Sequence, residues 1–474
     1  MLPPLTDSII DNVGSTPMVK LQLQQNVSIV AKLEYLNPSG SAKDRLAKYL
    51  LDKYEKENPF RDASRNKTLI IPTSGNLGIS LATLAAKRHY YRIIAILPER
   101  TSSDRIAVLK ALGVEILRSP NEVRPEAPES AYSVAAKLAE QLKNAIIMDE
   151  TKLRDLTAYH ELAQEIIEQT KTIQVDSIFV GAESGAMLTG IAHYIKEKLP
   201  NIKIIGVEPA ESILSDTEPN YPIRPDWKIE DLGNNFLPES LNKRLVDEWV
   251  KVSDKEAYSV ARRLIRDEGI LCGPSSGAVV AAIHKTHYTS PVVILNDAAK
   301  NYTSTLLSDD WLFENDLADD LITRELQYIS QDRYRAASVE DLQLAAAVTI
   351  NPSSTVSHAF DLMLEREYSQ LPVINKTNKK LVGYVSLSAL QDQLERGSVQ
   401  LTDTVESCMY TFKKGSEGVN KKYEIITPDT SLAELAKFFE RNSFAVITDA
   451  HRKWCLGVAT KYDLISFLHR RQFL

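Results

Sequence analysis

One lysine occupies a position at which a primary amine could carry out covalent chemistry. Lys43 lies in residues 37–45 (NPSGSAKDR), after a strand-like apolar run at residues 29–36 and before a helical pattern at residues 46–54. The positive end of the helix dipole and an apolar cleft would both favour a neutral amine, which forms an imine with an aldehyde. The alternative is that residues 43–45 are an ordinary, solvated helix start.

Further loops place small residues where a ligand could bind. Residues 73–78 read TSGNLG, residues 181–187 read GAESGAM, and residues 272–277 read CGPSSG. Small residues let the backbone approach a ligand closely, and amide groups at a helix start suit a carboxylate or a phosphate. Each loop taken alone could be an ordinary turn. Together with the Lys43 stretch, the loops exceed what folding alone requires.

These loops need a framework, and residues 10–300 supply alternating strands and helices. The expected strands are β-branched runs at residues 68–71, 92–97, 145–148, 177–180, 202–207 and 292–295. The expected helices lie at residues 79–89, 103–112, 133–142, 156–168, 187–198 and 255–267. This alternation predicts an α/β fold with parallel-rich sheets, in which ligand sites gather at the C-terminal ends of strands.

Composition excludes several classes of protein. The 474 residues carry a net charge of −7 and contain no run of 18 apolar residues. This balance argues against nucleic acid as a partner and against a membrane span. The N-terminus MLPPLTDSII has no basic region before an apolar core, so a cytoplasmic location is expected. The three cysteines are too few for a disulfide framework and too widely spaced for a metal motif.

The motifs, taken in order, resemble a known family. They are NPSGSAKDR, PTSGN-x-G, LPERTSSDRIAVLKALGVEI, GVEPAESIL and EGILCGPSSG. Together they are similar to the pyridoxal-phosphate-dependent β-family of fold type II, and within it to the cystathionine β-synthases. The resemblance covers most of residues 8–310 and includes a DDWL-x-EN-x-L-x-DD segment similar to fungal members. It implies a catalytic region of two α/β subdomains, expected at residues 1–325.

The resemblance also implies roles for particular residues. Lys43 would be the Schiff-base lysine for pyridoxal 5′-phosphate, Asn76 would hydrogen-bond the cofactor's ring oxygen, and Ser275 would face the pyridine nitrogen. The phosphate would be held by Ser184, Gly185, Ala186 and Met187. The amino-acid substrate would be bound by Thr73, Ser74, Gly75 and Tyr159. A neutral hydroxyl at the pyridine nitrogen makes a weaker electron sink, which favours prompt loss of a β-leaving group.

The implied reaction is a β-replacement. Serine would join the cofactor, Lys43 would remove the α-proton, hydroxide would leave, and a thiol would attack the β-carbon. With homocysteine as the thiol, the product is cystathionine. The family also implies a homodimer or a higher homo-oligomer. No haem is expected, because no cysteine precedes Cys272.

Several positions depart from the family pattern. Leu77 replaces a threonine in the carboxylate loop, and Glu150 stands where a glutamine is usual. Glu183 enters the phosphate loop, where its charge would repel a phosphate dianion. Asp231 and Asn234 fall in a segment, DLGNNF, that usually reads GIGYDF.

These departures leave three readings open. The first is a cystathionine β-synthase acting on serine and homocysteine. The second is a cysteine synthase-like enzyme that uses O-acetylserine and another nucleophile. The third is a catalytically silent homologue that senses an adenosyl ligand or serves as a partner subunit.

The C-terminal third carries an internal repeat. A polar stretch at residues 326–345 is expected to be a linker. Two copies of a strand, helix, strand, strand, helix pattern follow, at residues 346–396 and 397–474. They resemble tandem CBS modules, which are sensors of adenosyl ligands.

In such modules a Gly-x-x-Thr-x-x-Asp segment closes the nucleotide site. Gly457, Thr460 and Asp463 keep this spacing in the second copy, whereas the first copy keeps Ser386 but has Ala389 at the acidic position. The resemblance therefore implies one competent ribose clamp at most, for S-adenosylmethionine or an adenine nucleotide. The alternative is that Thr460 and Asp463 only cap a helix.

Overall fold

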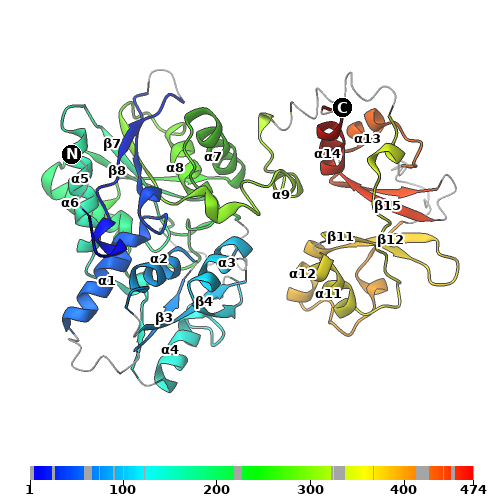
Figure 1. The fold of residues 1–474 in the computed structure, drawn as a ribbon, viewed down its shortest axis with the longest axis horizontal. Helices are drawn as coiled ribbons and strands as arrows, with labels where there is room; N and C mark the ends of the chain where they lie inside the picture. The colour runs from blue at the N-terminus through cyan, green and yellow to red at the C-terminus, as the bar shows by residue number, and fades with distance from the viewer. Residues whose placement is uncertain are drawn as a thin grey trace. The chain divides into compact units, whose positions relative to one another are not determined.

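The structure is a computed structural model that describes residues 5–23, 27–57, 67–73, 75–88, 91–99, 101–121, 123–142, 144–217, 227–321, 324, 337–366, 368–412, 426–440, 442–449 and 454–472. The chain divides into two compact units, Met1–Asp319 and Asp320–Leu474 (Figure 1). The division falls close to the end expected for the catalytic region, and each unit is described by itself.

A six-stranded sheet forms the larger half of the first unit (Figure 1). Its strands, in spatial order, are β1 (Met18–Lys20), β2 (Val30–Leu33), β10 (Pro291–Leu295), β7 (Ser177–Gly181), β8 (Lys203–Pro209) and β9 (Glu248–Val252). All neighbouring pairs are parallel except β1 with β2. The helices of this half are α1 (Lys43–Glu57), α5 (His160–Thr170), α6 (Ala186–Lys198), α7 (Asp254–Glu268), α8 (Pro274–Ile283) and α9 (Asp309–Glu314).

Both faces of this sheet are buried. Ile178 and Val180 in β7 belong to the core that includes side chains of α1, α5 and α6. Phe179 points to the other face, since successive side chains alternate along a strand, and it is equally buried. Helix α8 packs on β7, β8, β9 and β10. Burial on both faces explains why the inner strands read as continuous apolar runs.

A smaller, fully parallel sheet completes the first unit. Its order is β5 (Glu115–Ser119), β4 (Tyr91–Pro98), β3 (Lys67–Pro72) and β6 (Ala145–Ile147). The associated helices are α2 (Asn76–Ala85), α3 (Ser103–Ala111) and α4 (Ala131–Gln141). The two parallel-rich sheets confirm the predicted fold class, and ligand-binding loops are again expected at the C-terminal ends of the strands.

The second unit contains two copies of one motif. The first copy comprises α11 (Val356–Arg366), β11 (Gln370–Ile374), β12 (Leu381–Ser386), α12 (Leu387–Glu395) and β13 (Tyr410–Thr411). The second comprises α13 (Leu432–Phe438), β14 (Phe444–Thr448), β15 (Cys455–Thr460) and α14 (Lys461–Gln472). A parallel bridge before each copy, Ile350 to Val373 and Ile426 to Ile447, supplies the short first strand of the predicted pattern.

Part of the expected linker packs with the second copy. The 3-10 helix η7 (Val339–Leu342) contributes Val339 and Leu342 to the core that holds Leu432 and Leu464. A bridge between Ser338 and Ser431 fixes the same contact. Residues 325–336 lie outside the described part of the chain, so the linker boundary stays a prediction.

No helix within the described residues is both long and apolar enough to cross a lipid bilayer. Cys272 and Cys408 are buried thiols, and Cys455 is partly buried. Burial raises the pKa of Cys272 to about 12 and that of Cys455 to about 11. All three therefore stay protonated near neutral pH, as inert thiols do.

Candidate active site

Lys43 is the first residue of α1, and the turn before it fixes its position. Gly40 has a left-handed φ of 97°, and its amide donates to the carbonyl of Asn37 at 2.9 Å. The Ala42 amide donates to the carbonyl of Asn296 at 2.9 Å, which ties this turn to the loop after β10. Lys43 therefore lies at the C-terminal edge of the large sheet, where a ligand site is expected.

The helix start is not solvated. Lys43 is 8% exposed, and Asp44 and Arg45 are buried as well. Asp44 accepts a hydrogen bond from the Ser39 amide at 2.7 Å, and the Arg45 Nε donates to Glu34 Oε2 at 2.7 Å. The alternative that residues 43–45 are an ordinary, solvated helix start is therefore wrong, because each charged side chain is held by buried partners.

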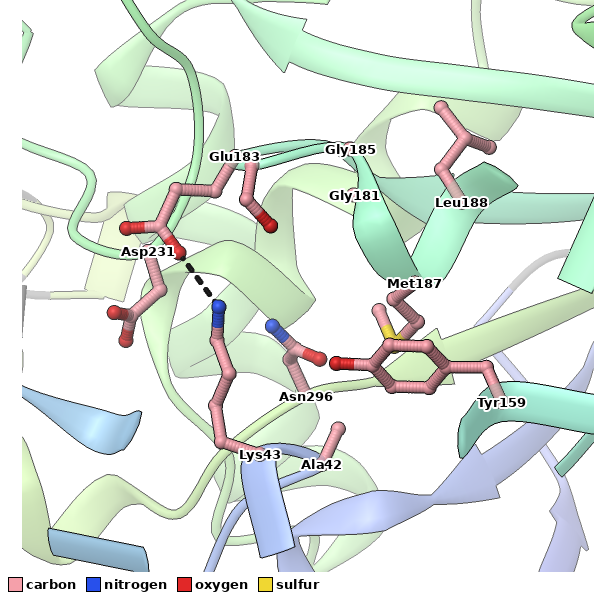
Figure 2. Close-up of a pocket in the computed structure, with 11 residues that line it drawn as sticks. Ala42, Lys43, Tyr159, Gly181, Glu183, Gly185, Met187, Leu188, Asp231 and Asn296 are labelled. Atoms are coloured by element: carbon pink, nitrogen blue, oxygen red, sulfur yellow. Dashed lines mark hydrogen bonds and ion pairs between the residues drawn. The ribbon is translucent and has the colours of Figure 1, made fainter. Parts of the chain in front are cut away.

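Two glutamates meet the amine of Lys43. Its Nζ lies 2.6 Å from each carboxylate oxygen of Glu150. It also lies 3.0 Å from Glu183 Oε2, the contact drawn as a dashed line in Figure 2. Burial lowers the pKa of Lys43, but the charges of Glu150 and Glu183 outweigh burial and hold this pKa well above its ordinary value. The expected neutral amine is therefore wrong. Nothing in the Lys43 stretch itself indicated carboxylates from two other loops.

Both glutamates are held by their own elements. Glu150 opens the 3-10 helix η3 (Glu150–Lys152), which follows β6 and is capped by Asp149 accepting from the Thr151 amide at 2.9 Å. Ser184 Oγ donates to Glu150 Oε2 at 2.8 Å. Glu183 lies in the loop between β7 and α6. The carboxylates are thus positioned by the two loops that flank the lysine.

The loop predicted to hold a phosphate is tightly packed. Gly185 has a φ of 77°, and a Cβ there would lie 2.5 Å from Leu241 Cβ, so only glycine fits. Ser240 Oγ donates to the carbonyl of Ser184 at 2.6 Å. Ser184, Gly185 and Met187 line the cavity beside Lys43, and Ala186 is the first residue of α6. The N-terminus of this 13-residue helix can offer amides to an anion.

Ser275 and Asn76 differ in how their polar groups are used. Ser275 lies in the first turn of α8, is 1% exposed, and its Oγ has no hydrogen-bond partner among the described residues. The Asn76 amide donates to Asp231 and Asp297 at 2.5 and 2.9 Å, and its oxygen accepts from Asn301 at 3.1 Å. A cofactor ring oxygen could bind Asn76 only by displacing one of these partners.

The predicted substrate residues fall on two elements. Thr73 Oγ1 accepts from the Gly75 amide at 3.1 Å, directly after β3. Gly75 has a φ of 136°, and a Cβ there would lie 2.7 Å from Arg105 Cδ. Tyr159 ends the 3-10 helix η4 (Thr157–Tyr159) and lines the cavity beside Lys43 (Figure 2). Ser74 lies outside the described residues.

Sequence reasoning missed a buried arginine at this site. Arg105, on α3, is fully buried, and its Nη1 donates to Asp231 Oδ1 at 3.0 Å. Its Nη2 also contacts Asp297 at 3.3 Å and the hydroxyl of Tyr302. Burial and the neighbouring Asp231 carboxylate raise the pKa of Asp297 to about 7. The sequence did contain a signal for this arginine. Asp231 is acidic where the family usually has glycine, and a buried carboxylate requires a cation nearby.

A second cavity, here called the aromatic cavity, adjoins the lysine. Its aromatic walls are Tyr132, Trp227 and Phe236, and the rings of Tyr132 and Phe236 meet edge to face at 5.5 Å. Thr73, Asn234, Asn235 and Ser184 also line it. Glu150 and Glu183 are the charged side chains among its described lining residues. Leu77 lies inside α2, fully buried, so it offers no polar group to this space.

The predicted nucleotide residues lie at equivalent places in the two copies of the second unit. Ser386 caps α12 by accepting from the Ala389 amide at 3.2 Å. Thr460 ends β15, and Asp463 accepts from the Thr460 amide at 2.7 Å and its hydroxyl at 3.0 Å. Gly457 lies three residues earlier in β15. The capping role is therefore present, and a ligand role stays a prediction.

The two copies meet beside these residues. Phe444 pairs with Thr460 across β14 and β15, and its ring contacts Tyr384 at a centroid distance of 4.9 Å. Tyr384 lies two residues before Ser386 in β12. The C-terminal ends of β12 and β15 are thus brought close together through this aromatic contact.

Comparisons with known proteins agree with this architecture. A family described as "Pyridoxal-phosphate dependent enzyme" matches residues 9–297, and the CBS domain family matches residues 339–396 and 418–470. Cystathionine beta-synthase of Dictyostelium discoideum is 39% identical over 99% of this chain and 93% of its own length. The Saccharomyces cerevisiae protein of the same name is 34% identical, with 97% of each chain covered.

A solved structure matches the first unit. The O-acetylserine dependent cystathionine beta-synthase from Helicobacter pylori superposes with a TM-score of 0.57 at 33% identity, covering 64% of this chain and 99% of that chain.

The fold and the site define an α/β enzyme of fold type II with a C-terminal pair of CBS modules. The chain belongs to the pyridoxal-phosphate-dependent enzyme family. It is a pyridoxal-phosphate-dependent β-replacement enzyme, as its relatives over nearly the full length indicate.

The residues present fit this cofactor at three points. Lys43 supplies the amine, the buried and unpaired Ser275 hydroxyl supplies a partner for the ring nitrogen, and the glycine-only turn at Gly185 opens a helix N-terminus toward a phosphate. The site differs from the family pattern at Glu150 and Glu183, the two carboxylates that form ion pairs with Lys43.

Proposed function

We propose that the first unit condenses L-serine with L-homocysteine to give L-cystathionine, the step that opens transsulfuration toward cysteine. The observation that carries this proposal is the match of both units, over nearly the whole chain, to curated cystathionine beta-synthases. The placement of Lys43 in a buried cavity at the C-terminal edge of the large sheet supports it.

The proposed assignments follow from the site. Lys43 would hold pyridoxal phosphate by its aldehyde carbon, Ser275 would face the ring nitrogen, and residues 184–187 would hold the phosphate. When bound, the cofactor supplies an electron sink for an amino acid's α-carbon. Thr73, Ser74, Gly75 and Tyr159 would orient the substrate's carboxylate, and burial excludes water from the reacting atoms.

Lys43 and Glu150 would carry out the proton transfers. Lys43 Nζ is the amine in the cavity beside the cofactor loop, so it would take the α-proton and later return it. Glu150 lies 2.6 Å away and can share the proton on Nζ. Neutral Ser275 would leave the electron sink weak, which favours loss of the β-substituent.

A visible absorption spectrum tests the proposal. Protein given pyridoxal phosphate should develop a visible band, and Lys43→Ala should abolish it. Lys48→Ala, on the same helix, is the matched control and should keep the band. Adding serine should change the band, and homocysteine should then give cystathionine. A chain that never acquires the band would be the silent homologue.

One observation favours a second candidate substrate. The Helicobacter pylori structure that matches at 33% identity is described as O-acetylserine dependent. O-acetylserine carries a better leaving group at the same carbon as serine, and the loss of a hydroxyl at Leu77 leaves fewer donors for the substrate carboxylate. Comparing the spectral change produced by serine with that produced by O-acetylserine decides between the two.

The second unit is proposed to bind an adenosyl ligand, either S-adenosylmethionine or an adenine nucleotide. The CBS domain match and the position of Thr460 and Asp463 at the end of β15 support this proposal. Ser386 and Gly457 would complete the site from β12 and β15. Binding would regulate the first unit by shifting its conformational equilibrium.

Further proposals concern the protein's location in the cell, its oligomeric state and its haem content. A cytoplasmic location is supported by three free cysteines, none of them in a disulfide. A homodimer is proposed from the family. We also propose a form without haem, from the resemblance of the DDWL-x-EN-x-L-x-DD segment to fungal members. Size-exclusion chromatography and the absorption spectrum of the purified protein test the last two.

A further inference from the structure

The loop after β10 contacts both the lysine and the asparagine that the proposed function assigns to the cofactor. The amide of Ala42, next to Lys43, donates to the carbonyl of Asn296 at 2.9 Å. Later in the same loop, Asn301 Nδ2 donates to Asn76 Oδ1 at 3.1 Å. One short segment of the chain therefore holds the start of α1 and the Asn76 side chain together.

The direction of the Asn76 amide decides what it can offer a ligand. Its Oδ1 only accepts hydrogen bonds and its Nδ2 only donates them, although the two ends have nearly the same shape. The ring oxygen of pyridoxal phosphate, when ionised, is an acceptor and needs the Nδ2 end. Asp231 and Asp297 accept from Nδ2 at 2.5 and 2.9 Å, while Asn301 holds the opposite end of the amide. If a ring oxygen displaces one carboxylate, the bond from Asn301 remains.

The side chain of Asn301 is not explained by the stability of the fold. Asn301 lies on the 3-10 helix η6 (Ala299–Tyr302) and is 2% exposed, yet its Oδ1 has no hydrogen-bond partner among the described residues. A buried oxygen without a partner costs stability, so an apolar residue of similar size would suit this position at least as well. The contact that accounts for an asparagine here is the one with Asn76.

We infer that Asn301 is a positioning residue, which keeps the Asn76 amide turned so that Nδ2 is offered to the ring oxygen of the cofactor. Without Asn301, the buried Asn76 Oδ1 loses its donor. A reversed amide would set Oδ1 against the ring oxygen, and two acceptors form no hydrogen bond. A hydrogen bond to Oδ1 also polarises the amide and strengthens its donor end. This inference rests on the proposed function, which assigns the ring oxygen to Asn76.

The test measures the dissociation constant of pyridoxal phosphate for the full chain, by titration of the visible band. Asn301→Leu keeps a similar volume and removes both the donor and the unpartnered oxygen, so it should weaken binding about tenfold. The denaturant midpoint of the cofactor-free protein should stay unchanged or rise. Asn301→Ala is a second variant and should weaken binding to a similar extent. Asn315→Leu, which removes a side-chain bond to the Trp311 carbonyl at 2.7 Å in the same unit, is the matched control and should bind like the wild type.

A double-mutant cycle tests whether Asn301 acts through Asn76. Asn76→Ala should itself weaken cofactor binding, and adding Asn301→Leu should then change the dissociation constant by less than about twofold, because the amide to be positioned is gone. A residue with a merely structural role would give losses that multiply. Asn301→Leu should also shift the visible band in the same direction as Asn76→Ala, since both reduce donation to the ring oxygen.

The outcomes separate the inference from the proposed function. Asn301 variants that bind the cofactor like the wild type overturn the inference, as do losses that multiply in the double variant, and the proposed function stands in both cases. If neither Asn301 variant folds, the residue is structural and the inference fails. Wild-type protein that never develops the visible band overturns the proposed function and the inference with it.

Discussion

At the scale of single residues, the ion pairs of Lys43 determine how the cofactor is taken up. The amine must lose a proton before it attacks an aldehyde, and Glu150, Glu183 and Tyr159 all raise its pKa against the effect of burial. The rate of cofactor uptake should therefore rise about tenfold per pH unit while the pH stays below that pKa. Stopped-flow absorbance between pH 6 and 9 measures this rate.

Removing one charge should change that profile. Glu150→Gln lowers the pKa of Lys43, so a larger fraction of the amine is neutral at pH 7 and uptake should be faster there. Glu197→Gln is the control and should follow the wild-type profile. An uptake rate that does not depend on pH, or an unchanged profile in Glu150→Gln, would contradict the ion-pair account.

Ser275 gives a second prediction at this scale. Its buried Oγ has no partner among the described residues, so Ser275→Ala should leave the free energy of unfolding unchanged or raise it by up to about 1 kcal/mol when no cofactor is added. The same variant should bind pyridoxal phosphate more weakly. Denaturant unfolding and a cofactor titration measure the two effects.

The neighbouring serine provides the control. Ser276 Oγ accepts from the Asn296 amide at 3.0 Å, so Ser276→Ala leaves that amide without its partner and should cost roughly 1 kcal/mol of stability. If Ser275→Ala proves equally destabilising, Ser275 has a structural partner and its assignment to the ring nitrogen fails.

The sequence predicted some of these residues and missed others for a physical reason. Lys43 and the loops that contain Gly185 and Ser275 are short local motifs that residue types alone could point to, and the resemblance to the family then implied the roles of Gly185 and Ser275. Arg105 is separated from Asp231 and Asp297 by more than a hundred residues, and only the folded chain brings the three together. The charge state of Lys43 was mispredicted because Glu150 and Glu183 come from distant loops.

At the scale of elements, the Arg105 network joins α3 of the smaller sheet to the loops after β8 and β10 of the larger one. Asp231→Gly restores the residue usual in the family and relieves a left-handed φ of 58°, yet it removes the closest carboxylate from a fully buried guanidinium. We expect a net loss of roughly 2 kcal/mol or more in unfolding free energy.

Asp231→Asn separates charge from shape in this network. It keeps one of the two side-chain oxygens that accept from Arg105 but removes the negative charge, so its cost should fall below that of Asp231→Gly. Chemical denaturation followed by tryptophan fluorescence compares the two variants. Equal stability of Asp231→Gly and the wild type would show that Asp297 and Glu230, whose Oε2 lies 3.3 Å from Arg105 Nη1, satisfy Arg105 without Asp231.

In the first unit, strand prediction succeeded in the sheet interiors and at the edge strand β6, expected at residues 145–148, but it failed at the other edges. The runs expected at residues 68–71, 177–180 and 292–295 became β3, β7 and β10, which have neighbours on both sides. The missed strands β1, β5 and β9 each lie at a sheet edge, and all three carry charged residues among the apolar ones. An edge strand is partly solvated, so it lacks the continuous apolar run that marks a buried strand.

At the scale of the whole molecule, the chain pairs a catalytic unit with a unit that the resemblance assigns to ligand sensing. A separate family model matches each of the two units of this chain. Coupling between the units requires that a ligand of the second unit change the conformational equilibrium of the first. Whether residues 320–474 bind an adenosyl ligand at all is therefore the first question for regulation.

Asp463 allows that question to be answered without confusing binding with folding. S-adenosylmethionine should raise the thermal transition of the second unit in the full chain, and Asp463→Asn should remove the shift, because an amide oxygen still caps α14 while the charge for the ribose hydroxyls is lost. Ser431→Ala, which removes the cap of α13 in the same copy, should lower the transition through a cost of about 1 kcal/mol yet keep the shift. Differential scanning calorimetry measures both. A shift that persists in Asp463→Asn would mean that Thr460 and Asp463 only cap the helix, and the ligand site would then lie elsewhere in the second unit.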